Sequence, residues 1–336
     1  MEKRIEWVDV YKGVLILLVV LAHSLQEVYK VCGLDFTSDG FRNMIYSFHM
    51  PAFMAMSGYL VYRPALIGEG KLGCIPMLYK RAKQLIVPLL IWSVPLSIAK
   101  DINYIDILLY PNDGYWFLWA LFFIIVIYNF VDLLCHKIHL NQEIGMIATA
   151  GALTGIQMVL PNAKILGFEY IAYYFLFYLM GYYANKYKDY LPEKSWIIWC
   201  IFAIWFVMAC FWTPNDLPFF LKGISFVPSK LLQLVYRMLT PVVFIVWMFS
   251  TAPKMKVGDS CIWKMLIEFG QISLGIYVAH MVVKKLFAHI LFDTLPMLPI
   301  WVHVVIEFVL LLILSWVVVK LIMMNKYSAK WILGKA

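Results

Sequence analysis

Residues 4–25 read RIEWVDVYKGVLILLVVLAHSL, and this stretch decides how the rest of the chain is interpreted. Charged residues come first, an uninterrupted apolar run covers 13–22, and His23 follows directly. On an α-helix the side chains of Lys12 and His23 lie about 20° apart around the axis, and Asp9 lies about 40° from His23 on the other side. Along the axis, roughly 16 Å separates Lys12 from His23. One helical face therefore carries an acid, a base and an imidazole at different depths.

The composition places this helix in a membrane. The chain has 336 residues, of which 63% are hydrophobic and 14% charged, and its mean hydropathy is +0.79. Soluble domains average about 25% charged and 45–50% apolar residues. We therefore expect a polytopic membrane protein. Its net charge of +8 reflects basic loops on the cytoplasmic side rather than nucleic-acid binding.

The apolar runs predict an all-α bundle of ten transmembrane helices, since each run is long enough to cross about 30 Å of hydrocarbon. We place them at 8–28, 42–62, 76–99, 115–135, 144–160, 166–185, 195–213, 231–251, 266–291 and 298–324. The first is not followed by a small-residue cleavage site, so we expect it to stay as a signal anchor. Residues 1–336 are expected to form one membrane domain without a fused soluble domain.

The distribution of basic residues predicts the orientation. With the N-terminus inside, most Lys and Arg residues fall in inner loops, and the outer loops carry only Lys30, Arg42, Lys100, Lys164, Lys222 and Lys230. The positive-inside rule then places both termini in the cytoplasm. The cysteines show no C-x-x-C pair, so we expect no thiolate metal site.

His23 has two interpretations in this setting. An ionisable side chain deep in a membrane is expensive and usually functional. It can also be a structural histidine that is hydrogen-bonded to a neighbouring helix. The residues alone favour neither interpretation.

The second predicted span contains Phe48-His49-Met50-Pro51 and Ser57-Gly58-Tyr59. Pro51 should loosen the helix near His49, because the carbonyl groups it frees need partners inside the membrane. The alternative is a kinked helix with no further role. At the start of the third span, Lys80, Arg81 and Lys83 could be cytoplasmic anchors that snorkel or, with Lys12, a clamp for an anionic ligand.

Further polar and aromatic residues fall within or beside the later spans. Tyr115 and Trp116 are either interfacial belt residues or part of a sugar site. The ninth and tenth spans form a hairpin in which His280 and Glu307 lie about equally far from the turn. We expect an intramembrane pair between Glu307 and an imidazole, either His280 or His23. The remaining candidates for buried charge are Glu169 and Arg237.

Together these motifs resemble those of the acyltransferase-3 family of bacterial integral-membrane acyltransferases. The resemblance rests on Trp7-x-Asp9-x-x-Lys12-Gly13, His23 eleven residues after a cation, the His49 and Ser57 segments, Trp116-Phe117-Leu118 and Ile272-Ser273-x-x-Ile276-Tyr277-x-x-His280. Lys80-x-x-Lys83 stands where the family usually has Arg-x-x-Arg. Lysines at 12, 80 and 83 keep the charge but lose bidentate phosphate geometry.

The resemblance implies transfer of an acetyl or other small acyl group from cytoplasmic acetyl-CoA to hydroxyls of surface or lipid-linked glycans. Lys12, Lys80, Arg81 and Lys83 would then bind coenzyme A. His23 would be a general base or a covalent acyl carrier, and Asp9, His280 and Glu307 would complete the catalytic group, Asp9 by ordering Lys12. The residues expected to bind the acceptor are His49, Ser57, Tyr59, Tyr115, Trp116, Glu169 and Arg237.

The expected location is the bacterial cytoplasmic membrane, in contact with membrane lipids. No metal or nucleic acid is expected, and homodimer formation stays open. The alternative function is a flippase or exporter of a glycan precursor, in which the same ionisable residues would relay protons. A structural or sensory membrane protein is the third class.

Overall fold

The computed structural model describes residues 5–62, 74–160, 164–294 and 298–335. Within these ranges the regular elements are α-helices and short 3-10 turns. The helices in the first half are α1 (Glu6–Val31), α2 (Gly40–Tyr46), α3 (His49–Tyr59), α5 (Cys74–Lys100), α6 (Tyr104–Leu109), α7 (Trp116–Lys137) and α8 (Gln142–Val159). Those in the second half are α9 (Phe168–Lys186), α10 (Ser195–Cys210), α11 (Ser229–Thr251), α12 (Cys261–Gln271), α13 (Ser273–Thr294), α14 (Ile300–Met323) and α15 (Lys326–Ile332).

The helical class and the multi-pass character follow from these elements. Of the described helices, six are long and apolar enough to cross a membrane, or seven if the bent pair α12–α13 counts as one span. The predicted spans at 42–62, 144–160 and 195–213 are also helical, but they form the broken pair α2–α3 and the shorter or less apolar helices α8 and α10. The total of ten spans stays a prediction.

Two predicted spans are broken. Between α2 and α3 the chain leaves helical geometry at Phe48, directly after Ser47, whose carbonyl group cannot receive the usual helical hydrogen bond because Pro51 has no N–H. The ninth span, expected to be one long helix, instead bends by 77° between α12 and α13. The predicted loosening near His49 is confirmed, and it places that histidine at the start of α3.

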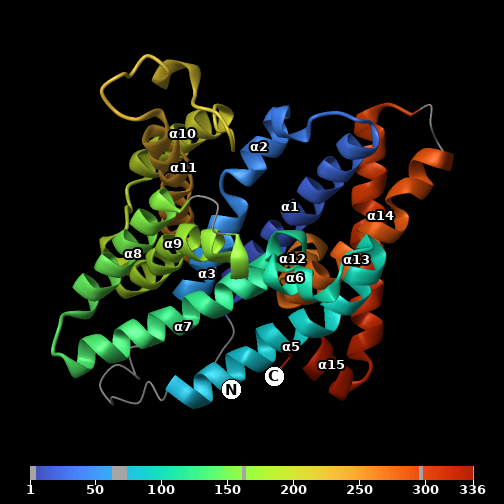
Figure 1. The fold of residues 1–336 in the computed structure, drawn as a ribbon, viewed down its shortest axis with the longest axis horizontal. Coiled ribbons are helices and arrows are strands. Elements are labelled where there is room, and N and C mark those ends of the chain that lie inside the picture. The colour runs from blue at the N-terminus through green and yellow to red at the C-terminus, as the bar shows by residue number, and fades with distance from the viewer. Residues whose placement is uncertain (1–4, 63–73, 161–163, 295–297, 336) are drawn as a thin grey trace.

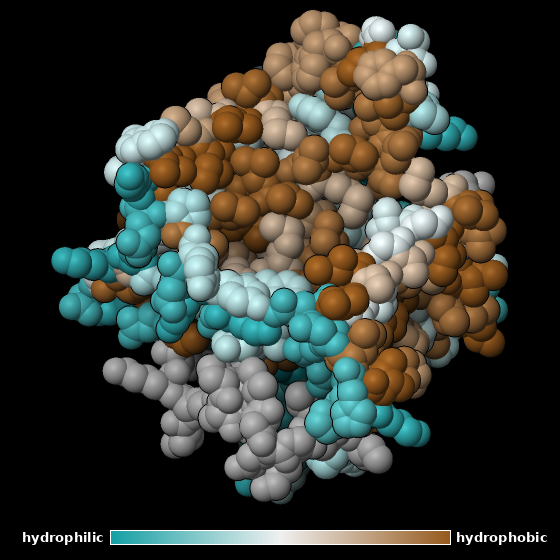
Figure 2. Space-filling view, turned by 90° about the vertical axis from the view of Figure 1, so that its left-hand side faces the viewer, coloured by the Kyte–Doolittle hydropathy of each residue, from teal (hydrophilic) through white to brown (hydrophobic). Residues whose placement is uncertain are grey.

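The helices pack in two groups, which are joined by contacts of α1 with α3 and of α5 with α7. On the right of Figure 1, α1 packs against α12, α13 and α14, and α15 packs against α5. On the left, α9 packs against α3, α7 and α8, and α10 packs against α11. In Figure 2, which faces that left side, hydrophobic side chains cover the upper and middle parts and hydrophilic ones form a band below them.

Glycines allow the closest helix contacts. A Cβ atom at Gly13 of α1 would collide with the Leu266 backbone of α12, and one at Gly270 of α12 would collide with the Asp9 backbone. The same holds between α3 and α9, where a Cβ at Gly181 would collide with the backbone of Ala55. Small residues at such contacts let membrane helices approach closely, and they fix the relative positions of the polar side chains on α1, α3 and α13.

Gly181→Ala should therefore lower the thermal stability of the detergent-solubilised protein. The added methyl group meets backbone rather than a movable side chain, and overpacking of this kind costs about 1–3 kcal/mol.

The matched control is Gly151→Ala on α8, where the new Cβ would meet nothing within 4 Å. It should leave the melting temperature unchanged or raise it slightly, because alanine has a helix propensity up to about 1 kcal/mol better than glycine. Equal melting temperatures for both variants would show that Gly181 is not a tight contact.

Candidate functional site

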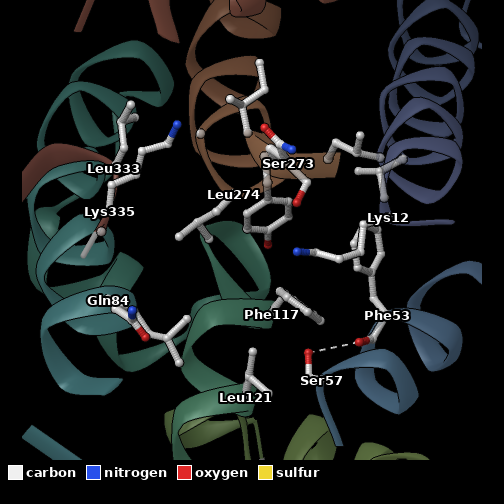
Figure 3. A pocket seen from close by; sticks show the side chains of 18 of the residues that line it. Lys12, Phe53, Ser57, Gln84, Phe117, Leu121, Ser273, Leu274, Leu333 and Lys335 are labelled. Atoms are coloured by element: carbon white, nitrogen blue, oxygen red, sulfur yellow. Dashed lines mark hydrogen bonds between the residues drawn. The ribbon is translucent and has the colours of Figure 1, made fainter. Parts of the chain in front are cut away.

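One cavity lies at the end of α1 where that helix begins, and we call it the inner cavity. Its volume is about 310 Å³, and its walls come from α1, α3, α5, α7, α13, α14 and the C-terminal residues (Figure 3). Its cations are Lys12, Arg81 and Lys335. Lys12 lies near the start of the chain and Lys335 near its end, so both ends reach the same side of the bundle.

The Asp9 carboxylate lies beside Lys12 rather than beside His23. It lies 3.9 Å from the Lys12 ammonium and accepts a 3.5 Å hydrogen bond from the side-chain amide of Gln271. The two side chains are therefore neighbours, as expected. Asp9 therefore holds a cation at the edge of the inner cavity, about fourteen residues of helix away from the imidazole.

The predicted cations of α5 do not all line the inner cavity. Arg81 and Gln84 line the inner cavity and are joined by a 3.2 Å hydrogen bond. Lys80 is exposed and does not line it. Lys83 points instead to aromatic rings, with its ammonium 4.1 Å from the Tyr79 ring centroid. Of the three predicted cations on α5, Arg81 is therefore the one that lines the inner cavity.

A second, larger cavity of about 640 Å³ lies at the other end of the same helices, and we call it the outer cavity. Three of its cations, Lys30, Arg42 and Lys100, are ones that the sequence assigned to outer loops. His23 and His49 also line it.

The two cavities share a wall. Val19, Met50 and Tyr277 line both of them. His23 lies one helical turn beyond Val19, on the outer side of this wall. The inner cations and His23 are therefore separated by the length of the inner cavity and the thickness of one layer of side chains.

His23 is hydrogen-bonded to His280, its Nδ1 lying 2.7 Å from the His280 Nε2. The rings are stacked with centroids 5.0 Å apart. The Nδ1 of His280 lies 2.9 Å from the carbonyl oxygen of Ile276. A carbonyl oxygen only accepts, so His280 donates from Nδ1 and its Nε2 accepts from the Nδ1–H of His23. The Nε2 of His23 is then left with its lone pair, as a base requires.

The tautomer of His49 follows from the same argument. Its Nδ1 lies 2.7 Å from the carbonyl oxygen of Ile45. That nitrogen must donate, so Nε2 is the nitrogen left with a lone pair. Two imidazoles from different helices therefore line the outer cavity with their tautomers fixed by backbone carbonyl groups, directly or through His280.

One turn beyond the imidazole pair, α1 and α13 form a second polar contact. Glu27 lies 3.4 Å from the Lys284 ammonium and 2.6 Å from that of Lys285. Glu27 is four residues after His23, and Lys284 is four residues after His280, so the two contacts form successive rungs between the helices. Both Glu27 and Lys284 are almost fully buried.

The expected pair between Glu307 and an imidazole, either His280 or His23, is not formed in the described part of the chain. Both ring nitrogens of His280 are occupied by His23 and Ile276. Glu307 is 4% exposed, and neither of its carboxylate oxygens has a hydrogen-bond partner. The hairpin does bring α13 and α14 together, but the side chains at matching depth point to different neighbours.

The aromatic candidates separate into two kinds. Trp116 lines the outer cavity and stacks on Tyr170, with centroids 4.4 Å apart. Tyr115 and Tyr59 line neither cavity. Tyr115 is buried and donates a 2.9 Å hydrogen bond to the carbonyl oxygen of Val278, and Tyr59 is stacked on Phe249.

The other expected acceptor residues lie in different places. Ser57 lines the inner cavity and donates a hydrogen bond to the carbonyl oxygen of Phe53 (Figure 3). Glu169 does not line the outer cavity, but it accepts a 2.7 Å hydrogen bond from Asn112, which does. Arg237 lies over the ring of Tyr173 and lines neither cavity.

Comparison with known proteins gives the family. A family model described as an acyltransferase domain matches residues 5–320. The nodulation protein NolL of Sinorhizobium fredii is 36% identical over 122 residues, which are 33% of this chain and 32% of that protein. NolL of Mesorhizobium japonicum is 35% identical over 126 residues, 34% of this chain and 32% of that protein. The chain thus matches about a third of the length of these relatives. No solved structure matches it.

The contact of Glu27 with Lys284 and Lys285 leads to a prediction about stability. Glu27→Gln should lower the free energy of unfolding by roughly 3–5 kcal/mol, because it leaves Lys284 buried without its carboxylate. The double variant Glu27→Gln/Lys284→Met should cost clearly less than the sum of the single ones, as measured by thermal melting.

Glu143→Gln is the control. Glu143 pairs with Lys186, and both side chains are partly exposed at 34% and 26%. Pairs of this kind contribute only about 0–1 kcal/mol. If Glu27→Gln costs no more than this control, the buried pair does not join α1 to α13.

Proposed function

Because this chain belongs to the acyltransferase family whose model matches residues 5–320, we propose that it is a membrane-embedded O-acyltransferase. It moves an acetyl or other small acyl group from cytoplasmic acyl-CoA to a hydroxyl of a surface or lipid-linked glycan. It acts in the cytoplasmic membrane of a bacterium with both termini inside. The observation that carries this proposal is the pair of cavities that meet at one wall, with Lys12, Arg81 and Lys335 in the inner cavity and His23 in the outer one.

The inner cavity suits the acyl donor. Lys12, Arg81 and Lys335 supply positive charge for the phosphates of coenzyme A, and arginine can bind a phosphate through two parallel hydrogen bonds. Further in, the lining is largely apolar and includes Phe53 and Phe117. A pantetheine arm would lie there and place its thioester at the wall. The rise of α1 between Lys12 and His23, roughly 16 Å, sets the length that the arm must span.

The outer cavity suits the acceptor. His23 Nε2 takes the proton of the acceptor hydroxyl while the hydroxyl oxygen attacks the thioester carbon. The carbon–sulfur bond breaks, the acetyl ester forms, and the imidazolium returns the proton to the coenzyme A thiolate. His280 is a positioning residue, because it holds the His23 ring in the tautomer that exposes Nε2.

A covalent route uses the same nitrogen. His23 Nε2 would attack the thioester first and carry the acetyl group until the acceptor hydroxyl displaces it. In both routes coenzyme A and an acetyl ester are the products, and no ion gradient is consumed. A glycan flippase would instead need a gradient and would release no coenzyme A.

The first functional test removes the base and then its positioning residue. With labelled acetyl-CoA and extracted surface glycans, His23→Ala should abolish labelling of the glycan and leave coenzyme A binding near normal. His280→Leu should lower kcat by about 10²–10⁴-fold, the range of a lost general-base contribution, at an unchanged KM for acetyl-CoA.

His280→Gln is the conservative variant, since its side-chain oxygen can accept the hydrogen bond from His23 Nδ1. It should recover part of the activity that His280→Leu loses. Equal loss in both variants would reduce His280 to a packing residue. More than a few per cent of wild-type labelling in His23→Ala would remove His23 from the chemistry.

The second functional test compares two neighbouring cations on α5. Arg81→Gln should raise the KM for acetyl-CoA by about tenfold, equal to about 1.4 kcal/mol, because Arg81 faces the inner cavity. The effect should grow at low salt, where the attraction is less screened. Lys80→Gln removes the same charge from an exposed position outside the cavity and should change KM by less than about twofold. The reverse order would return the binding role to Lys80.

A further inference from the structure

The outer cavity is strongly positive, and part of its lining is buried between helices. Among the described residues that line it, five are cations and none is a carboxylate; the cations are Lys30, Arg42, Lys100, Lys284 and Lys285. Two buried acids lie next to this group: Glu27, which two of the lysines share, and Glu307, which interacts electrostatically with both of those lysines. A neutral sugar acceptor would need none of this charge, and charge in a low-dielectric site is costly unless it has a partner.

Among these cations, Arg42 is the clearest case of a buried positive charge without a carboxylate partner in the described ranges. It is 6% exposed, and its guanidinium lies 3.8 Å from the ring centroid of Tyr46 and 4.8 Å from that of Phe36. It donates a 2.9 Å hydrogen bond to Asn43, which is uncharged, and its buried Nε has no hydrogen-bond partner. Within the described ranges no carboxylate forms an ion pair with it. Arg42 is therefore a desolvated cation with unused donors in the wall of a polar cavity.

Two acids of the same segment, Asp35 and Asp39, lie near Arg42, and neither forms an ion pair with its guanidinium group. Asp35 interacts with Arg42 electrostatically, and its carboxylate accepts hydrogen bonds from Thr37. Asp39 accepts a 2.6 Å hydrogen bond from the backbone N–H of Arg42 and a 2.8 Å hydrogen bond from the hydroxyl group of Tyr29. It thus caps α2 and ties it to α1, while the guanidinium group faces the aromatic rings and the cavity. An arginine fixed between rings keeps its donors in a plane, which matches the planar face of a carboxylate or the oxygens of a phosphate.

On the opposite wall, one carboxylate serves two ammonium groups. Lys285 lies 2.6 Å and Lys284 lies 3.4 Å from the Glu27 carboxylate. Lys285 is the more accessible lysine, with 26% of its side chain exposed. His23 lies one turn from this group on α1, and Trp116 stacked on Tyr170 forms an aromatic surface in the same cavity.

We propose that the outer cavity recognises an anionic group on the acceptor, a carboxylate or a phosphate, with Arg42 and Lys285 as its ligands. This proposal rests on the proposed acyl transfer and names the chemical class of its acceptor. The anionic group is bound by Arg42 and Lys285, the neighbouring sugar ring lies against Trp116, and one of its hydroxyl groups reaches Nε2 of His23. A uronic acid or a phosphorylated or lipid-phosphate-linked sugar would satisfy this arrangement.

Equilibrium binding to the purified full-length protein tests the proposal without turnover. The probes are methyl glucuronide, glucose 1-phosphate and methyl glucoside, each titrated with coenzyme A at saturation so that the inner cations are already occupied. At least one anionic probe should bind about tenfold or more tightly than methyl glucoside, the effect of one charge-assisted hydrogen bond. Preference for the glucuronide identifies a carboxylate, and preference for the phosphate identifies a phosphoryl group.

Two variants and one control locate the effect. Arg42→Gln and Lys285→Gln should each remove most of the preference, and the partly exposed Lys285 keeps the test available if Arg42→Gln does not fold. Lys320→Gln removes a cation of α14 that pairs with Glu268 and lines neither cavity, so it should leave the preference unchanged. Equal binding of all three probes, or a preference that survives in both outer-cavity variants, would overturn the proposal.

Coenzyme A release in the presence of extracted glycans separates this inference from the proposed function. Coenzyme A release together with equal binding of neutral and anionic probes would contradict anion recognition and leave acyl transfer standing. Anion preference lost in Arg42→Gln, in a protein that never releases coenzyme A, would support the anion site and contradict acyl transfer.

Discussion

The hydrogen bond between His23 and His280 joins the first helix of the chain to one near its end, and the arrangement of the site depends on it. Its 2.7 Å length requires α1 and the α12–α13 pair to lie at close range, which Gly13 and Gly270 permit because larger residues there would collide with backbone. Once this register is set, Glu27 meets Lys284 one turn further along. At the other end of α1, Asp9 meets Lys12 beside the inner cavity. A single helix–helix contact therefore positions the imidazole and the cations at both ends of α1.

The same contact explains why the bundle can hold two cavities without becoming a pore. Val19, Met50 and Tyr277 come from α1, α3 and α13, and they form the layer between the inner and outer cavities. A donor and an acceptor that enter from opposite sides would meet there. Both cavities are lined by cations, but the inner lining is otherwise largely apolar, whereas Trp116 gives the outer cavity an aromatic surface.

The sequence predicted the elements that local patterns encode. The helical class, the apolar segments, the break near His49 and the pairing of Asp9 with Lys12 all follow from spacing along one or two turns.

The sequence did not predict contacts that depend on tertiary packing. Matching depth suggested a pair between Glu307 and His280, whereas the rotation of α1 against α13 brings His23 to His280 instead. Likewise, the sequence named Lys80, Arg81 and Lys83 together, and only the rotation of α5 in the fold shows that Arg81 is the one that lines the inner cavity. Lys335 reaches the inner cavity because Trp92 bonds the backbone of Ile332 and fixes the chain end against α5. Lys284 was accessible to sequence reasoning, since it lies four residues after His280 on the same helical face.

The central claim is that donor and acceptor reach His23 from opposite sides of the membrane through cavities that meet at the Val19–Met50–Tyr277 wall. The most direct measurement uses sealed proteoliposomes of one orientation, with labelled acetyl-CoA added only at the face of the chain termini and the acceptor glycan enclosed at the other face. The claim predicts that the enclosed glycan becomes labelled, and that Val19→Trp, which fills the wall, stops labelling while coenzyme A still binds. Labelling that occurs only when donor and acceptor are on the same side, or that continues unchanged in Val19→Trp, would contradict it.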